Sequence, residues 1–124
     1  MKNVETPHFK VWLGEDGIIR FRWMPGMHVT LDLAKQTEKP VARFNTKKTH
    51  PLLVFLDGTK SIDRDARTCL SNMSGPSAVA LVGVSPIARI IGNMFIGLNR
   101  QVTLPLRMFT TEDEAIQWLK GFNG

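Results

Sequence analysis

Hydroxyl, carboxylate and guanidinium groups that could bind an anion occur where the sequence predicts that strands end and helices begin. In an open parallel sheet, ligands bind beyond the carboxyl ends of the strands. The first backbone N–H groups of a helix are unpaired and attract a phosphate or carboxylate. Helix capping is the commoner role for Ser and Asp at such positions. Both roles therefore stay open for Asp63 and Ser85. The residues of the predicted anion site are Asp63, Arg64, Ser85 and Arg89.

The familiar catalytic and metal-binding motifs are absent from the sequence. The three histidines lie far apart and lack the spacing of metal ligands: His8, His28 and His50. Asp63 and Asp65 diverge on a helix and cannot form a carboxylate pair. Cys69 is expected on the inner side of a helix, where a thiol is structural. We therefore expect no cofactor and no metal site, and we favour a non-catalytic protein over an enzyme of unknown type.

The segment 85–100 carries apolar residues at helical spacing over more than one side of a helix. The residues expected to pack on a sheet are Ile87, Ile90, Ile91, Met94 and Leu98, and those expected to extend the apolar arc outward are Phe95 and Ile96. A helix that is apolar over more than one side is usually buried on more than one side. The second side would contact another subunit or an apolar ligand. The residues of this predicted interface or pocket are Met94, Phe95, Leu98 and, on a separate surface, Trp12.

Trp12 is expected among three cations, Lys10, Arg20 and Arg22, on the outer side of a hairpin. Three explanations stay open for this surface: a solvated edge, a platform for a polyanion and a subunit contact. The net charge of +5 favours a polyanion in general terms. The basic residues are scattered along the chain, however, so we do not expect a nucleic acid as partner.

The elements that must position these residues alternate between strands and helices. Two alternating patterns flank an Asp-Gly turn and predict a hairpin towards one sheet edge, and uninterrupted apolar runs predict buried strands. Pro40 should kink or restart one helix. We expect strands at 9–13, 19–23, 52–56, 78–82 and 104–109, and helices at 31–44, 63–73, from 85 and from 111. The order β-β-α-β-α-β-α-β-α predicts an α/β fold with an N-terminal hairpin and a mixed, mostly parallel sheet.

Length and composition fit a single domain over residues 1–124. The single cysteine fits a reducing compartment. The opening residues lack the apolar stretch of a secretory signal, and no apolar run is long enough to span a bilayer. We therefore expect a cytoplasmic protein without a membrane span.

Three segments resemble STAS domains, the fold of bacterial anti-sigma-factor antagonists. The segment 51–63, PLLVFLDGTKSID, is similar to a strand-to-helix junction of that fold. The segments 85–98 and 109–119, the latter FTTEDEAIQWL, are similar to uncharacterised bacterial STAS/SEC14-like proteins. The resemblance covers the last three-fifths of the chain, and the hairpin order agrees with it.

The resemblance implies a module that binds rather than catalyses, either a homodimer or a binder of another protein. STAS antagonists carry a phosphoacceptor serine after an Asp that Asp63 matches, but Arg64 and Asp65 stand where the serines would be. We therefore expect no kinase switch of the family type and no kinase label on Ser61. The SEC14-like side implies a pocket for a small lipophilic ligand, an alternative that stays open beside self-association.

Overall fold

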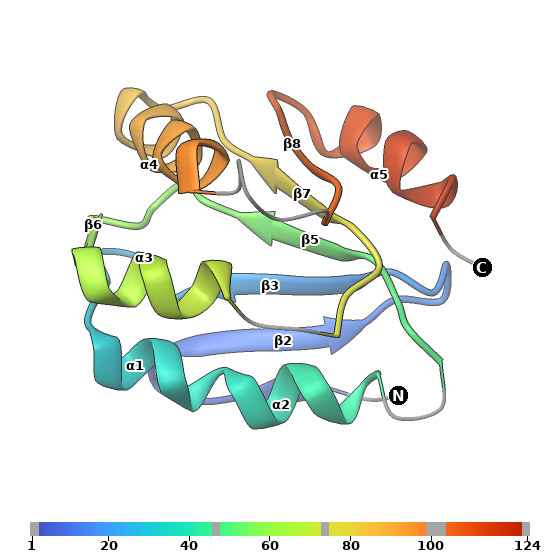
Figure 1. Cartoon of the computed structure of the whole chain (residues 1–124), viewed down its shortest axis with the longest axis horizontal. Coiled ribbons are helices and arrows are strands. Elements are labelled where there is room, and N and C mark those ends of the chain that lie inside the picture. The colour runs from blue at the N-terminus through green and yellow to red at the C-terminus, as the bar shows by residue number, and fades with distance from the viewer. Residues whose placement is uncertain (1–2, 46–47, 73–74, 99–103, 123–124) are drawn as a thin grey trace.

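A six-stranded mixed sheet organises the chain, for which the computed structural model describes residues 3–45, 48–72, 75–98 and 104–122 (Figure 1). The strand order is β1-β2-β3-β5-β7-β8. Strands β1, β2 and β3 are antiparallel, and β3, β5, β7 and β8 are parallel. The strands are β1 (Asn3–Glu5), β2 (Phe9–Leu13), β3 (Ile19–Trp23), β5 (Leu52–Phe55), β7 (Val79–Val82) and β8 (Leu106–Phe109). The predicted α/β fold and mostly parallel sheet are confirmed.

Four helices cover one side of this sheet, and one helix packs on the other (Figure 1). The first group is α1 (Leu31–Gln36), α2 (Glu38–Arg43), α3 (Arg64–Ser71) and α4 (Pro86–Leu98), and the single helix is α5 (Glu112–Lys120). We call these sides the front and the back of the sheet. Side chains alternate along each strand, so one apolar core lies in front and a smaller one lies between the sheet and α5.

The predicted hairpin is formed by β2 and β3, whose inward side chains pack in the front core. Phe9 stacks on Phe21 and contacts the edge of Trp23. Gly17 has a φ of 80° in the connecting turn, a conformation that glycine adopts without strain. The sequence did not predict β1, which pairs outside β2 and forms the sheet edge.

The predicted helix over 31–44 is interrupted, as Pro40 indicated. Helices α1 and α2 meet at the buried Thr37, whose hydroxyl donates to the Ala34 carbonyl at 2.7 Å. Pro40 lies in the first turn of α2, where its missing N–H group costs little. Ala34, Val41 and Phe44 are buried, as expected.

The orientation of α4 differs from the prediction. Phe95 is buried with 9% of its surface exposed, whereas Ile87, Ile90 and Met94 are 50%, 55% and 40% exposed. The small residues of α4 explain the rotation, because a Cβ added to Gly92 would lie 2.1 Å from the Met108 sulfur. Small residues let the helix approach the sheet closely, so their side of α4 faces inward and the side with Ile87, Ile90 and Met94 faces outward. The Leu98 side chain lies outside the described residues.

The remaining core helices follow the prediction more closely. In α3, Ala66 is buried and Cys69 and Leu70 are half-buried, while Met73 lies outside the described residues. In α5, Ala115 and Leu119 are buried against the back of the sheet.

A second, two-stranded sheet was not predicted. It consists of β4 (His28–Val29) and β6 (Ser61–Ile62), which run parallel. Figure 1 shows β6 on the side towards which β5 and β7 point, beside the starts of α1 and α3. This small sheet brings the segments before α1 and α3 together at the end of the domain where a ligand was expected.

Candidate functional site

A carboxylate of the chain itself lies at the start of α4, where an anion was predicted to bind. Asp57, which follows β5, accepts hydrogen bonds from the backbone N–H of Val84 at 3.1 Å and of Ser85 at 3.0 Å. Burial opposes ionisation of Asp57, but the hydrogen bonds from Ser85 and Val84 outweigh it and hold the pKa below its ordinary value. Ser85 also caps the helix, because its hydroxyl accepts from the Ala88 N–H at 3.1 Å.

Asp63 does not cap α3, contrary to the expectation from its position. It is the N-cap residue, but its side chain makes no hydrogen bond to the helix. Its Oδ1 lies 3.0 Å from Nε2 of His28 instead. The other ring nitrogen of His28, Nδ1, contacts the Ser61 hydroxyl. The structure therefore groups Asp63 with His28 and Ser61.

The other residues of the predicted anion site do not join this group. Among the described residues, no hydrogen bond or ion pair connects Asp63 with Ser85. Arg64 and Arg89 are exposed in the first turns of α3 and α4. Anion binding by these two cations stays a prediction.

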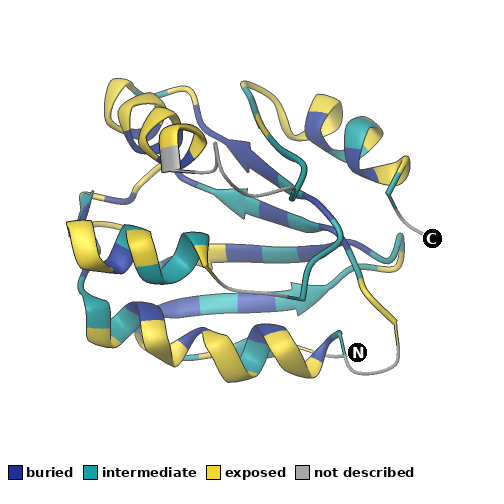
Figure 2. Ribbon diagram, in the orientation of Figure 1, coloured by how far each residue is buried: buried dark blue, intermediate teal, exposed yellow. Residues whose placement is uncertain are grey.

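The outer side of α4 carries an exposed apolar row. Figure 2 shows that most of this helix is exposed, with buried positions on the side towards the sheet. Val84 precedes the helix and is 62% exposed, and the spacing of three and four residues places Ile87, Ile90 and Met94 along one side. Ile96 is 40% exposed. We call Val84, Ile87, Ile90 and Met94 the outer row; of the predicted interface residues, Met94 belongs to it and Phe95 does not.

Phe95 lines an apolar cavity in the front core. The cavity has a volume of about 110 Å³ and lies between the sheet and helices α2, α3 and α4. Thr37 and Ser71 are the hydroxyl residues of its wall. The apolar wall includes Phe21, Trp23, Val41, Val54, Leu81 and Phe95.

Trp12 belongs to an aromatic and basic surface on the back of the sheet. Its ring lies parallel to that of Phe55, with an angle of 7° and centroids 6.3 Å apart. The Lys10 Nζ lies 5.1 Å from the Trp12 ring centroid, and the Arg22 guanidinium lies 4.7 Å from that of Phe55. Cation–π contacts of this kind partly stabilise the charges of Lys10 and Arg22 within the chain. Phe55 was not predicted to be part of this surface.

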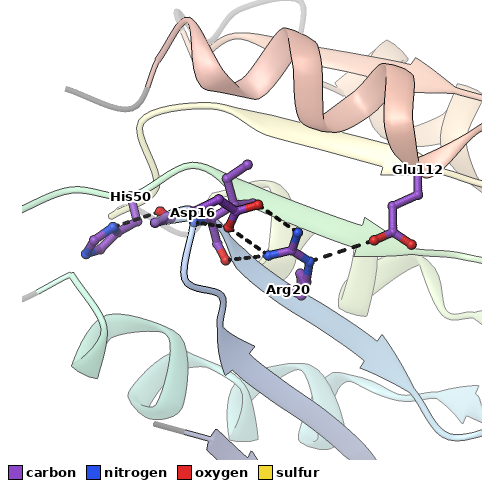
Figure 3. A network of polar contacts seen from close by, with 6 residues as sticks. Asp16, Arg20, His50 and Glu112 are labelled. Atoms are coloured by element: carbon purple, nitrogen blue, oxygen red, sulfur yellow. Dashed lines mark hydrogen bonds and ion pairs between the residues drawn. The ribbon is translucent and has the colours of Figure 1, made fainter. Parts of the chain in front are cut away.

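Arg20, the third predicted cation of that surface, holds the hairpin to α5 (Figure 3). Its guanidinium donates to both carboxylate oxygens of Asp16, at 3.0 and 2.9 Å, and lies 3.9 Å from Glu112. The hydrogen bonds between Arg20 and Asp16 lower the pKa of Asp16 and raise that of Arg20. Beside this pair, the His50 ring contacts the Gly17 carbonyl at 2.9 Å. Arg20 therefore has a structural role.

Sequence reasoning missed the group formed by His28, Ser61 and Asp63. Thirty-three positions separate His28 from Ser61, and strands of two residues leave no periodic pattern. A serine and an aspartate two positions apart are the only local signal, and they fit a turn equally well. Within the described ranges, no set of three or more His, Cys, Asp or Glu side chains could hold a metal ion. No described helix is long and apolar enough to cross a bilayer.

Comparison with solved structures shows the fold. An uncharacterised protein of the DUF3478 family from Shewanella loihica PV-4, with a SpoIIAA-like fold, is 14% identical over 94% of this chain and 98% of its own, with a TM-score of 0.63. The phosphorylated form of the Bacillus cell fate determinant SpoIIAA is 16% identical over 89% of this chain and 97% of its own, with a TM-score of 0.51. The chain therefore has a STAS, or SpoIIAA-like, fold, as its sequence resemblance implied.

Within that class, the chain belongs to a family described as a domain of unknown function, DUF7793. The family model matches residues 11–123. A protein of unknown function from Arthrobacter sp. FB24 is 35% identical over 88% of this chain and 90% of its own, with a TM-score of 0.36. No curated protein matches the chain.

Proposed function

We propose that this protein is a STAS-type interaction module that self-associates through the outer row of α4. The observation that supports this proposal is the set of large apolar side chains left exposed there: Val84, Ile87, Ile90 and Met94. A contiguous apolar patch on a soluble domain marks an interaction surface. Burial of the row removes roughly 25 cal/mol of unfavourable hydration per Å² of apolar area.

A second copy of the chain is the partner that fits the outer row. The row contains no charged residue, so two identical rows can face each other without repulsion between like charges. An interface of this kind is self-complementary, as in the common two-fold dimers. Arg89 and Asn93 are exposed beside the row on the same helix, where they would form a polar rim around an apolar centre.

Light scattering across a concentration series tests self-association. We expect the wild-type protein to form dimers at about 100 μM, a concentration at which weak dimers are populated. Ile90→Glu should be monomeric with an unchanged circular dichroism spectrum. Gln117→Glu is the matched control, since it adds the same charge to an exposed position of another helix, α5, and it should dimerise like the wild type. A wild type that stays monomeric, or an Ile90→Glu variant that dimerises normally, contradicts the proposal.

The cavity supports a second candidate function, the binding of a small apolar ligand. Its wall is almost entirely apolar, and its volume of about 110 Å³ suits a compact molecule or part of an acyl chain. For comparison, an engineered apolar cavity of about 150 Å³ admits benzene. Native mass spectrometry of the protein as expressed should show a bound ligand. Leu81→Phe, which would fill the cavity, should lose it, and a clean unliganded mass under several extraction conditions counts against this function.

The proposed module lacks the kinase switch that the sequence resemblance would otherwise imply. Arg64 and Asp65, which replace the serines of the family motif, lie exposed in the first turn of α3. Asp65 supplies part of the charge of a phosphate there. Incubation with kinases of the anti-sigma type should leave the protein unlabelled, and stoichiometric phosphate on Ser61 would restore the regulatory function.

A further inference from the structure

His28 is held between a hydroxyl and a carboxylate that both come from the segment 61–63. Its Nδ1 contacts the Ser61 hydroxyl, and its Nε2 lies 3.0 Å from the carboxylate of Asp63. Ser61 and Asp63 are two positions apart along an extended segment, so their side chains project to the same side. The order of groups, a hydroxyl, an imidazole and a carboxylate, is that of hydrolase triads, with the two ring nitrogens exchanged.

The chemistry of the three groups determines where the protons lie. An ionised carboxylate only accepts hydrogen bonds, so Nε2 of His28 must carry a proton and donate it to Asp63. In a neutral imidazole, Nδ1 is then the unprotonated nitrogen and accepts. In this tautomer the Ser61 hydroxyl donates its proton to Nδ1, the arrangement in which an imidazole can act as a general base towards a serine.

The backbone around the three side chains is fixed by the pairing of β4 and β6. His28 is the register partner of Ser61, and Val29 is the partner of Ile62. The Asp63 N–H donates to the Val29 carbonyl at 2.9 Å, which continues the pairing beyond the strands. Val29 and Ile62 are buried in the front core. The pair of strands thus anchors the group while leaving it open, because the side chains of His28 and Asp63 are 54% and 47% exposed.

We propose that Ser61 is an activated nucleophile that takes up an acyl group from a small activated ester, with His28 as its base and Asp63 as a positioning residue. The Ser61 oxygen forms a bond to the carbonyl carbon of the ester while its proton moves to Nδ1 of His28. The bond between that carbon and the leaving alcohol breaks, and the alcohol departs as its anion. The imidazolium then returns its proton to the alkoxide or to water, which leaves an acyl-serine.

The site shares no residue with the outer row. The side chains around Ser61 are about half exposed. This favours small esters, which can reach Ser61 directly from solvent. This proposal adds a covalent modification site to the interaction module. It differs from phosphorylation, because the donor is an ester and the chain itself supplies the base.

Covalent labelling of the whole chain with an ethyl fluorophosphonate reagent tests whether Ser61 is activated. The Ser61 oxygen bonds to phosphorus, the phosphorus–fluorine bond breaks, fluoride leaves, and the proton passes through His28 to water. The chain has no tyrosine to compete for the reagent. Peptide mapping by mass spectrometry compares Ser61 with Ser71 in the same sample, because the Ser71 hydroxyl donates to the Thr68 carbonyl. A base contributes about 10²–10⁴-fold in enzymes, so we expect Ser61 to react at least about 10-fold faster than Ser71.

Three variants separate general-base activation from simple exposure. His28→Gln should reduce the labelling of Ser61 to the rate of Ser71, and Asp63→Asn should reduce it by a smaller factor. His8→Gln is the control for loss of a histidine elsewhere and should leave the rate unchanged. Circular dichroism checks that each variant is folded. The proposal is overturned if Ser61 reacts no faster than Ser71 in the wild type, or if labelling is unchanged in both His28→Gln and Asp63→Asn. The group would then be an ion pair with an adjoining hydrogen bond.

Discussion

Helices α4 and α5 each follow a strand of the parallel sheet and begin at a hydroxyl N-cap, but they use their outer sides differently. Helix α5 buries Ala115 and Leu119 and presents mainly polar residues to solvent. Helix α4 buries Ala88, Ile91 and Phe95, and still leaves the outer row exposed. The core of the chain therefore accounts for the apolar residues of α5. In α4 it buries only three of the seven Ala, Ile, Met and Phe residues whose side chains are described. The excess on α4 is what a partner would bury.

The two helices also begin differently. The Thr111 hydroxyl accepts from the Glu114 N–H at 3.2 Å and donates to the Glu114 carboxylate at 2.9 Å, so the start of α5 is stabilised by neighbours in sequence. The start of α4 combines its own Ser85 with Asp57 from the preceding strand-to-helix connection. The hydrogen bonds at the start of α4 thus come partly from the tertiary fold, whereas those of the α5 N-cap come from local sequence. The tertiary contact at the start of α5 is the ion pair between Glu112 and Arg20 at 3.9 Å.

The largest expected effect separates the two sides of α4. Phe95→Asp should unfold the domain, because a carboxylate forced into the front core without a partner costs several kcal/mol as an order of magnitude. Ile90→Asp, which places the same charge on the outer row, should leave the circular dichroism spectrum and the cooperative melt intact. A folded Phe95→Asp variant would mean that the inner side of α4 is not the one described.

Shortening one buried side chain in α5 and one exposed side chain in α4 tests the same contrast between buried and exposed apolar residues. Leu119→Ala in α5 should lower the free energy of unfolding by about 2–5 kcal/mol, since Leu119 is fully buried against the back of the sheet. Ile90→Ala in α4 should change the stability of the monomer by less than about 0.5 kcal/mol. Urea unfolding at low protein concentration measures both values. Equal losses in the two variants would show that the outer row contributes to the fold of a single chain.

Features encoded by local periodicity were predictable from the sequence. The β2–β3 hairpin, the buried strands and the inner side of α5 follow from alternation, apolar runs and a capping motif. The orientation of α4 was not predictable, because large apolar residues lie on both sides of the helix. The side facing the sheet is chosen by the small residues Ala88 and Gly92, which fit against Gly83 and Met108.

The candidate site was predictable only in its location. The sequence placed Asp63 and Ser85 at the carboxyl end of the sheet, but it could not assign their partners. Asp57 and His28 reach them through tertiary contacts between segments that are 27 or more positions apart. Contacts of this kind depend on the register of short strands and on loop geometry, which leave no periodic pattern in the sequence.

Two glycine substitutions in α4, one on each side of the helix, should change the free energy of unfolding by about 1 kcal/mol or less. Gly97→Ala should stabilise the domain by about 0.5–1 kcal/mol, because Gly97 has open space around it and alanine favours a helix. Gly92→Ala should destabilise it instead, since the added Cβ would displace the Met108 side chain from the helix–sheet contact. Thermal unfolding of the two variants should give shifts of opposite sign. A stabilised Gly92→Ala variant would indicate that Met108 moves aside without loss of packing.

The smallest expected effect concerns Asp57, which follows β5 and accepts hydrogen bonds from the backbone at the start of α4. The pKa of Asp57 is lower in the folded chain than its ordinary value of 3.8, so the ionised form is bound more tightly by the fold than the protonated form. The resulting stability is fully present above that ordinary value and is lost as the pH falls through the lower, folded-state pKa. Asp57→Asn should cost roughly 0.5 kcal/mol at pH 7, as for a charge at a helix N-terminus.

The difference in unfolding free energy between wild type and Asp57→Asn should therefore shrink as the pH is lowered from 5 to about 2. Urea titrations at several pH values measure it. Asp113→Asn in α5 is the matched control: Asp113 also lies in a first helical turn, but no hydrogen bond to it is found among the described residues. Its effect should be smaller at pH 7. If the two variants behave alike, the start of α4 is stabilised by its dipole alone, and the tertiary contact from Asp57 adds nothing that the local start of α5 lacks.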